Sequence, residues 1–257
     1  MNILFTICGR AGSKGCKNKN ISSLHGVPLV YYPIAVIKLY KEAHPDDRVL
    51  TALNTDSIDL QRLVDNQTML DDIISVPRKP EFADSVAAKV DVIKDSYLRV
   101  KEKTGLNFDA VIDLDITSPM RRLVDLENII AEYNSKPDYD VVYTAVPARR
   151  NPYFNMAMAT PDGFYKKVCA SNFTARQQAP AIFELNACIY AFRPELLDSD
   201  IDRTIMEYKC GLSVMPDYLV LDIDSEDDLK MMDYLYGYYV ENDPDLKKIY
   251  EIAARAV

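Results

Sequence analysis

The sequence predicts an α/β fold built on a mainly parallel sheet. Short apolar segments alternate with amphipathic segments of about 10 to 18 residues through the first half of the chain. This alternation is typical of βαβ units, in which consecutive strands are parallel and helices cover the sheet. The 257 residues suffice for one large domain, and no linker-like tract or internal repeat divides them. We therefore expect a single domain over residues 1–257.

The predicted elements of the first half follow one another in regular order. Strands are expected at 2–8, 48–54, 72–77 and 108–115, because these runs are apolar with few interior charges. Helices are expected at 27–43, 56–67, 86–103 and 123–135, because apolar residues recur there with helical spacing.

The pattern changes after residue 135. A strand at 140–146 is followed by an irregular stretch, and we interpret residues 147–182 as an inserted, hairpin-bearing arm. Long insertions in compact α/β domains are more often functional than idle. Strands are predicted again at 184–192 and 219–224. A helix should begin after Ser225, which can cap it together with Asp228.

Composition excludes several classes of function. A net charge of -9 and a pI near 4.8 argue against a broad nucleic-acid or anionic-membrane surface. The sequence contains no apolar run of about 18 residues and no secretory pattern at its start, which predicts a cytoplasmic protein without a membrane segment. Five cysteines without a CxxC pair indicate reduced thiols, and two histidines make histidine-based metal sites or a catalytic triad poor hypotheses.

Despite the acidic composition, a basic, glycine-rich loop follows the first predicted strand. It contains Gly9, Gly12 and Gly15 together with Arg10, Lys14, Lys17 and Lys19. Glycines let backbone N–H groups converge on an anion, and the cations add charge, so the loop can enclose a polyphosphate. Its spacing matches neither the GxGxxG nor the GxxxxGK[ST] pattern, which disfavours a dinucleotide-binding Rossmann domain and a P-loop NTPase. The alternative is a solvated basic loop.

Two aspartate pairs are predicted at the same edge of the sheet. Asp113 and Asp115 end the predicted strand 108–115, and Asp222 and Asp224 end the predicted strand 219–224. Mg²⁺ is commonly held by one or two carboxylates plus substrate phosphates, so the pairs favour metal-assisted phosphoryl or nucleotidyl transfer. As the alternative, aspartates at strand ends serve as turn formers or helix caps.

The arm carries arginines and aromatic side chains. Arg149, Arg150 and Arg176 can capture a carboxylate or phosphate in a bidentate manner. The aromatics need a surface to cover them, which a second subunit can provide; the alternative is that the arm folds back on its own domain.

Together the motifs resemble the CMP-sialic acid synthetase (acylneuraminate cytidylyltransferase) family, most closely its members that activate bacterial nonulosonic acids such as legionaminic acid. The motifs are "ICGRAGSKGCKNKNI", "LNTDS", "DLDITSPMR", "PARRNPYFN", "RQQAP", "ELNACIYAF" and "LDIDSEDDL". The resemblance implies a Rossmann-like nucleotidyltransferase, a three-layer sandwich with a protruding dimerisation arm. It also implies a Mg²⁺-dependent reaction of CTP with a nine-carbon sugar acid to give the CMP-sugar and pyrophosphate.

The resemblance assigns roles to particular residues. The residues that would bind the nucleotide are Arg10, Gly12, Ser13, Lys14, Lys19, Asn20 and Arg78. Among them, Asn20 and Arg78 would recognise cytidine. Asp222 and Asp224 would bind Mg²⁺. The sugar acid would be bound by Asp115, Arg149, Arg176 and Asn186, and the catalytic residues would be Arg10, Lys19 and Asp224. Arg176 would act from the neighbouring subunit.

Two departures from the family pattern concern the sugar. Sialic-acid members have Gln where this chain has Asp115, and often Arg where it has Glu184. Both changes disfavour N-acetylneuraminate and favour a legionaminic- or pseudaminic-type acid. The alternative for Asp115 is a role as metal ligand, which acids at this strand end have in related sugar nucleotidyltransferases. The alternative functions are a guanylyl- or other nucleotidyltransferase acting on a sugar 1-phosphate and a non-catalytic nucleotide-binding protein.

Overall fold

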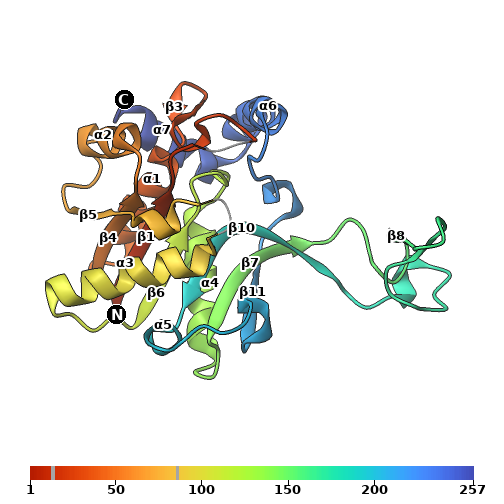
Figure 1. Cartoon of the computed structure of the whole chain (residues 1–257). Coiled ribbons are helices and arrows are strands. Elements are labelled where there is room, and N and C mark those ends of the chain that lie inside the picture. The colour runs from red at the N-terminus through yellow and green to blue at the C-terminus, as the bar shows by residue number, and fades with distance from the viewer. Residues whose placement is uncertain (13–14, 85–86) are drawn as a thin grey trace.

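A seven-stranded sheet organises the described part of the chain. The computed structural model describes residues 1–12, 15–84 and 87–257. The strand order is β11-β7-β10-β6-β1-β4-β5 (Figure 1). The strands are β1 (Asn2–Gly9), β4 (Arg48–Thr55), β5 (Ile73–Pro77), β6 (Ala110–Leu114), β7 (Val141–Pro147), β10 (Phe183–Phe192) and β11 (Cys210–Val214). Only β10 runs antiparallel to its neighbours among these strands, which confirms the predicted α/β fold with a mainly parallel sheet.

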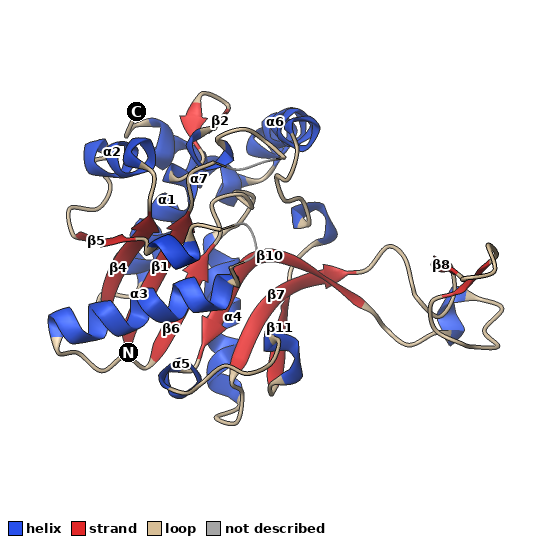
Figure 2. Cartoon of the chain, in the orientation of Figure 1, coloured by secondary structure: helices blue, strands red, loops and turns tan. Residues whose placement is uncertain are grey.

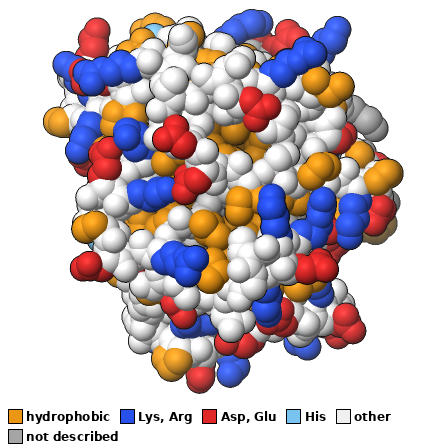
Figure 3. All heavy atoms as spheres, turned by 90° about the vertical axis from the view of Figure 1, so that its left-hand side faces the viewer, with side chains coloured by type: hydrophobic (Ala, Val, Ile, Leu, Met, Phe, Trp, Pro, Cys, Tyr) orange, Lys and Arg blue, Asp and Glu red, His pale blue; other side chains and the backbone are white. Residues whose placement is uncertain are grey.

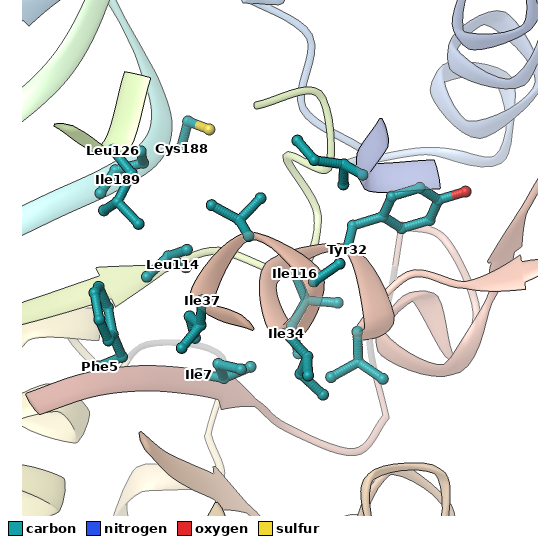
Figure 4. Packing of buried hydrophobic residues seen from close by; sticks show 14 of the residues in the cluster. Phe5, Ile7, Tyr32, Ile34, Ile37, Leu114, Ile116, Leu126, Cys188 and Ile189 are labelled. Atoms are coloured by element: carbon teal, nitrogen blue, oxygen red, sulfur yellow. The ribbon is translucent and has the colours of Figure 1, made fainter. Parts of the chain in front are cut away.

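Helices cover both faces of the sheet and make three layers (Figure 2). They are α1 (Tyr31–Ala43), α2 (Ile58–Asn66), α3 (Lys89–Thr104), α4 (Leu123–Ser135), α5 (Pro194–Asp198), α6 (Glu226–Asn242) and α7 (Pro244–Ala254). Side chains alternate along β1, so that Ile3, Phe5 and Ile7 face the core shared with α1 and α4. Figure 4 shows Phe5 and Ile7 in this core. Leu4 faces the opposite core with α3 and α5.

Two predicted helices begin later than expected, and the C-terminal helix is an addition. The helix expected at 27–43 begins at Tyr31, because Val27–Pro28 (β3) instead pairs with Ser23–Leu24 (β2). The helix expected at 86–103 begins at Lys89, and Ser85 and Val86 lie outside the described residues. Helix α7 was not predicted.

The strand expected at 219–224 is wrong. Residues 217–219 form a 3-10 turn, and the segment after it is a loop. Ile223 is fully buried and its N–H donates to the carbonyl of Thr117 at 3.0 Å, so its apolar side chain anchors the loop against the core. The strand that closes this edge is β11, which pairs in parallel with β7.

The inserted segment forms an arm that projects from the body (Figure 1). It leaves through the end of β7 and returns through β10, where Pro147 and Phe183 are paired. Its tip carries the predicted hairpin, formed by β8 (Ala157–Ala159) and β9 (Tyr165–Lys167). Phe164 and Tyr165 are 71% and 78% exposed, so this chain alone does not bury the aromatic tip. Burial by a second subunit stays a prediction.

The described surface carries both signs of charge. On the face seen in Figure 3, basic and acidic side chains are interspersed. No helix in residues 1–12, 15–84 or 87–257 is long and apolar enough to cross a membrane.

Candidate active site

Four neighbouring parallel strands each end at a polar residue on one edge of the sheet. Arg10 follows β1, Asp56 follows β4, Arg78 follows β5 and Asp115 follows β6. Carboxyl ends of parallel strands are where open α/β sheets bind ligands. A cavity of about 180 Å³ opens there, and its lining includes Arg10, Lys19, Asn20, Arg78, Lys89 and Asp115. The structure thus brings five predicted site residues into one cavity, along with Lys89, which was not predicted.

Backbone hydrogen bonds shape the basic loop at its start. The amide N–H of Ala11 donates to Asp56 Oδ1 at 2.8 Å, and Asn20 Nδ2 donates to the carbonyl of Arg10 at 2.9 Å. Gly12 has φ +67°, a conformation that residues with a Cβ seldom adopt. Ser13 and Lys14, both predicted to bind the triphosphate, lie outside the described residues.

The basic loop and the Asp222–Asp224 segment meet at one place, as the sequence predicted. Lys19 Nζ lies 3.1 Å from Asp224 Oδ1 and donates to the carbonyl of Ile223 at 2.9 Å. A Cβ added to Gly15 would lie 2.2 Å from the carbonyl oxygen of Asp224, so only glycine allows this approach. The convergence is therefore confirmed, although the two aspartates lie on a loop and not at a strand end.

Asp222 is partly buried near the carboxylates of Asp115 and Asp224. Burial, followed by repulsion from Asp115, raises the pKa of its carboxyl above the ordinary value. Its Oδ1 accepts a hydrogen bond from Ser118 Oγ at 3.3 Å. Among the described residues, no three His, Cys, Asp or Glu side chains form a group that could hold a metal by themselves. Asp222 and Asp224 still suit Mg²⁺, which takes one or two carboxylates plus phosphate oxygens, and a cation would relieve the repulsion at Asp222.

Lys89, the first residue of α3, contacts both Asp113 in β6 and Asp115, which follows that strand. Its Nζ lies 2.9 Å from Asp113 Oδ2 and 2.5 Å from Asp115 Oδ2. Burial by itself lowers the pKa of Lys89, but Asp113 and Asp115 outweigh burial and raise it well above its ordinary value. Burial likewise opposes ionisation of Asp115, yet Lys89 and Thr117 hold its pKa well below the usual range. Both groups are therefore charged at neutral pH.

Arg78 is held in the cavity wall by Asn54, which sequence reasoning did not assign. Arg78 Nε donates to Asn54 Oδ1 at 2.9 Å, and Nη2 donates to the Asn54 carbonyl at 3.2 Å. Asn54 is fully buried and its Nδ2 donates to Ser96 Oγ on α3 at 3.0 Å. The "LNTDS" motif was the available signal, because a buried Asn within a strand requires polar partners.

The arm arginines do not line this cavity. Arg149 pairs with Asp217 at 3.1 Å, and Arg176 donates to the carbonyl of Arg149. Arg149 and Glu184 line a separate, partly apolar cavity of about 540 Å³ at the root of the arm. A role for Arg149 and Arg176 toward the sugar therefore stays a prediction that requires another subunit or a movement of the arm.

Asn186 is buried within the sheet. Thr144 Oγ1 donates to its Oδ1 at 2.7 Å, and its Nδ2 donates to the carbonyl of Leu219 at 3.2 Å. It occupies an irregularity of β10, where the register with β7 shifts between Leu185 and Tyr190. These bonds give Asn186 a structural role in shaping β10, and its predicted contact with ligand stays untested.

Comparisons with known proteins agree with this geometry. No protein-family model matches the chain. The chain is 35% identical to post-translational flagellin modification protein B of Campylobacter coli and 34% identical to CMP-N,N'-diacetyllegionaminic acid synthase of Campylobacter jejuni subsp. jejuni. Each match covers 91% of this chain and 94% of the relative. An N-acylneuraminate cytidylyltransferase of Streptococcus agalactiae is 26% identical, over 98% of this chain and 57% of its own length.

Solved structures agree on the fold. A CMP:2-keto-3-deoxy-manno-octonic acid synthetase complexed with CTP superposes with a TM-score of 0.62 at 14% identity, covering 93% of this chain and 99% of that one. The 4-diphosphocytidyl-2C-methyl-D-erythritol synthase of Anaerococcus prevotii gives 0.53 at 13% identity, covering 92% and 99%. The chain therefore has the fold of nucleotidyltransferases, as predicted.

Proposed function

The chain belongs to the CMP-nonulosonate synthetase family, and from this premise we propose that it transfers CMP from CTP to a nonulosonic sugar acid and releases pyrophosphate. It is a nucleotidyltransferase of the cytidylyl-transferring class. The observation that carries the proposal is the junction of Lys19 with Ile223 and Asp224, because Lys19 lines the cavity and the junction brings the Asp222–Asp224 segment next to the basic loop.

The charges that line the cavity suit the nucleotide. Arg10, Lys19 and Arg78 contribute positive charge, and the loop from Gly9 adds backbone N–H donors for the triphosphate. During the transfer, the anomeric hydroxyl of the sugar attacks the α-phosphorus and pyrophosphate leaves. Arg10 and Lys19 stabilise the negative charge that moves onto the phosphate oxygens. The hydroxyl proton leaves through water held by the Asp222 and Asp224 carboxylates.

We further propose that the reaction depends on Mg²⁺. Asp222 and Asp224 would hold the ion together with phosphate oxygens of CTP. When bound, the ion polarises those oxygens and neutralises part of their charge. The support is the carboxylate pair itself, whose segment meets the basic loop at Lys19.

The sugar we propose is a legionaminic-type acid. The relative with that activity in its name is 34% identical along most of both chains. Asp115 lies in the cavity wall where sialic-acid members have a neutral Gln, so the sugar's carboxylate would point away from this acidic floor. We propose that Arg149 and Arg176 receive it from the arm of a second subunit in a homodimer. Because CTP is a metabolite of the cytoplasm, we also propose that compartment.

A pyrophosphate-release assay tests these proposals. The purified chain is incubated with each of the four ribonucleoside triphosphates against a panel of nonulosonic acids and sugar 1-phosphates, with Mg²⁺ and after its removal by EDTA. We expect release only with CTP plus a nonulosonic acid, lost with EDTA and restored by Mg²⁺. Release with GTP and a hexose 1-phosphate, but none with CTP, would replace this proposal with the sugar-1-phosphate nucleotidyltransferase. Full activity in EDTA would refute the metal dependence alone.

A further inference from the structure

The two aspartates at the end of β6, Asp113 and Asp115, have several partners within the protein. Besides the contacts with Lys89, Asp113 Oδ1 accepts from Thr6 Oγ1 at 2.8 Å. Asp115 Oδ1 accepts from both the N–H and the Oγ1 of Thr117, each at 2.8 Å. Three of the four carboxylate oxygens therefore accept a hydrogen bond from the protein, and the fourth, Asp113 Oδ2, is paired with the Lys89 ammonium by charge alone at 2.9 Å.

Lys89 is fixed in this position from several sides. Its ammonium lies 4.9 Å from the centre of the Tyr190 ring, in addition to the two carboxylates. It belongs to the first turn of α3, whose packing against β1 and β4 holds the backbone in place. Its side chain remains 34% exposed because it also forms part of the cavity wall.

We propose that Lys89 takes the place of a cation between Asp113 and Asp115, so that these carboxylates bind no metal and Asp222 and Asp224 alone supply the protein's metal ligands. The inference rests on the proposed function and decides a question that the sequence leaves open, namely whether Asp115 is a metal ligand. Lys89 is thereby a positioning residue: it keeps Asp115 ionised and oriented toward the cavity.

Charge and geometry favour this assignment. Two carboxylates side by side at a sheet edge attract a cation, and an ammonium 2.5 to 2.9 Å from both provides one permanently. A divalent ion at Asp115 would have to displace Lys89 and leave its positive charge beside the metal in a partly buried site. Asp222, in contrast, accepts from the neutral Ser118 hydroxyl at 3.3 Å. Asp224 pairs with Lys19 through Oδ1, but its side chain is 80% exposed, so an ion can reach it without displacing a buried charge.

Binding of Mn²⁺, measured by the loss of the free-ion electron paramagnetic resonance signal, tests the inference without turnover or nucleotide. Removing the ammonium by Lys89→Met exposes two carboxylates, so we expect at least tenfold tighter Mn²⁺ binding than in the wild type. The double variant K89M/D115N should lose this gain, and Lys89→Arg should bind Mn²⁺ as the wild type does. Asp115→Asn alone should leave wild-type Mn²⁺ binding within twofold.

Lys41→Met is the matched control. Lys41 pairs with the surface carboxylate of Asp72 at 3.1 Å and is 30% exposed, close to the exposure of Lys89, but it joins only one carboxylate. This variant should gain no Mn²⁺ site. If Lys89→Met does not fold, as judged by circular dichroism, Lys89→Gln replaces it, with the same expected gain.

Two results would overturn the inference. One is a folded Lys89→Met or Lys89→Gln protein that binds Mn²⁺ no better than the wild type. The other is a loss of tenfold or more in Mn²⁺ affinity for Asp115→Asn alone, because Asp115 would then be a ligand. Neither result depends on CTP or on product formation, so failure of the proposed cytidylyl transfer would be seen separately in the pyrophosphate assay.

Discussion

Gly15→Ala should impair the enzyme more than it impairs the fold. The added methyl would lie 2.2 Å from the carbonyl oxygen of Asp224, about 1 Å closer than the 3.4 Å at which ordinary contact begins. The obstacle is backbone, so no side chain can rotate away. Either the basic loop or the Asp224 segment must move by about that amount, and the contacts of Lys19 with Ile223 and Asp224 move with it.

The size of the effect follows from this displacement. A shift of about 1 Å at a reacting centre can cost about 100-fold in rate, equivalent to about 2.7 kcal/mol of transition-state stabilisation. Overpacking of this kind lowers the free energy of unfolding by about 1–3 kcal/mol. We therefore expect kcat/KM for CTP to fall about 100-fold, measured by pyrophosphate release, while thermal unfolding still shows a folded protein at assay temperature.

Gly105→Ala is the control for stability. Gly105 ends α3 with φ +66°, and nothing lies within 4 Å of an added Cβ, so alanine there costs about 1–2 kcal/mol of backbone strain far from the cavity. It should lower Tm but leave kcat/KM within twofold. If Gly15→Ala retains kcat/KM within threefold of the wild type, the contact between the loop and Asp224 does not set the geometry of the site, and the reasoning fails.

Three further predictions concern the charges. Asp222→Asn should raise the Tm of the ligand-free protein at pH 7–8, because a carboxyl whose pKa is raised in the folded state opposes folding when it is ionised. The gain in Tm should vanish as the pH falls through that pKa, and a lowered Tm at pH 7–8 would contradict the assigned burial. Steady-state kinetics of Lys19→Ala and Asp224→Ala should each show kcat lowered by about 100-fold or more and a smaller change in the KM for CTP, since the partners of both side chains gain charge in the transition state. A change confined to KM would refute that role. Arg176→Ala should raise the KM for the sugar acid about tenfold or more through loss of a charge-assisted pair, and an unchanged KM would remove the arm from the sugar site.

The repeating part of the fold was predictable from sequence because its signals are local. Apolar runs such as 2–8 and 48–54 become buried parallel strands, and the amphipathic segment 123–135 becomes α4 with the predicted boundaries. The run ending at Asp224 misled the prediction because burial of Ile223 requires an apolar residue but no strand partner. The edge strand β11 contains Gly211 and Ser213, and its pairing with β7 is a tertiary property that no local pattern reveals.

Site residues that belong to a loop motif were predictable from the sequence, whereas those that join the site through tertiary contacts were not. Arg10, Lys19, Asn20 and Arg78 stand in or next to strand-end loops, and the structure gathers them in one cavity. Lys89 has the local pattern of a solvated lysine at the start of an amphipathic helix. Only folding reveals its partners, which lie 24 and 26 positions further along the chain on another element. Asn186 was assigned to ligand, and that prediction stays untested; the structure adds hydrogen bonds of its amide to Thr144 and Leu219, which no local pattern reveals.

The root of the arm has an evolutionary consequence. The arm leaves and re-enters through two antiparallel neighbours, with Pro147 and Phe183 facing each other across the ladder. Its two ends are thus already as close as the ends of a tight hairpin, so the length and composition of the segment between them can vary without disturbing the strands. The distal part of the arm can therefore diverge between related proteins while the sheet that carries the cavity stays the same.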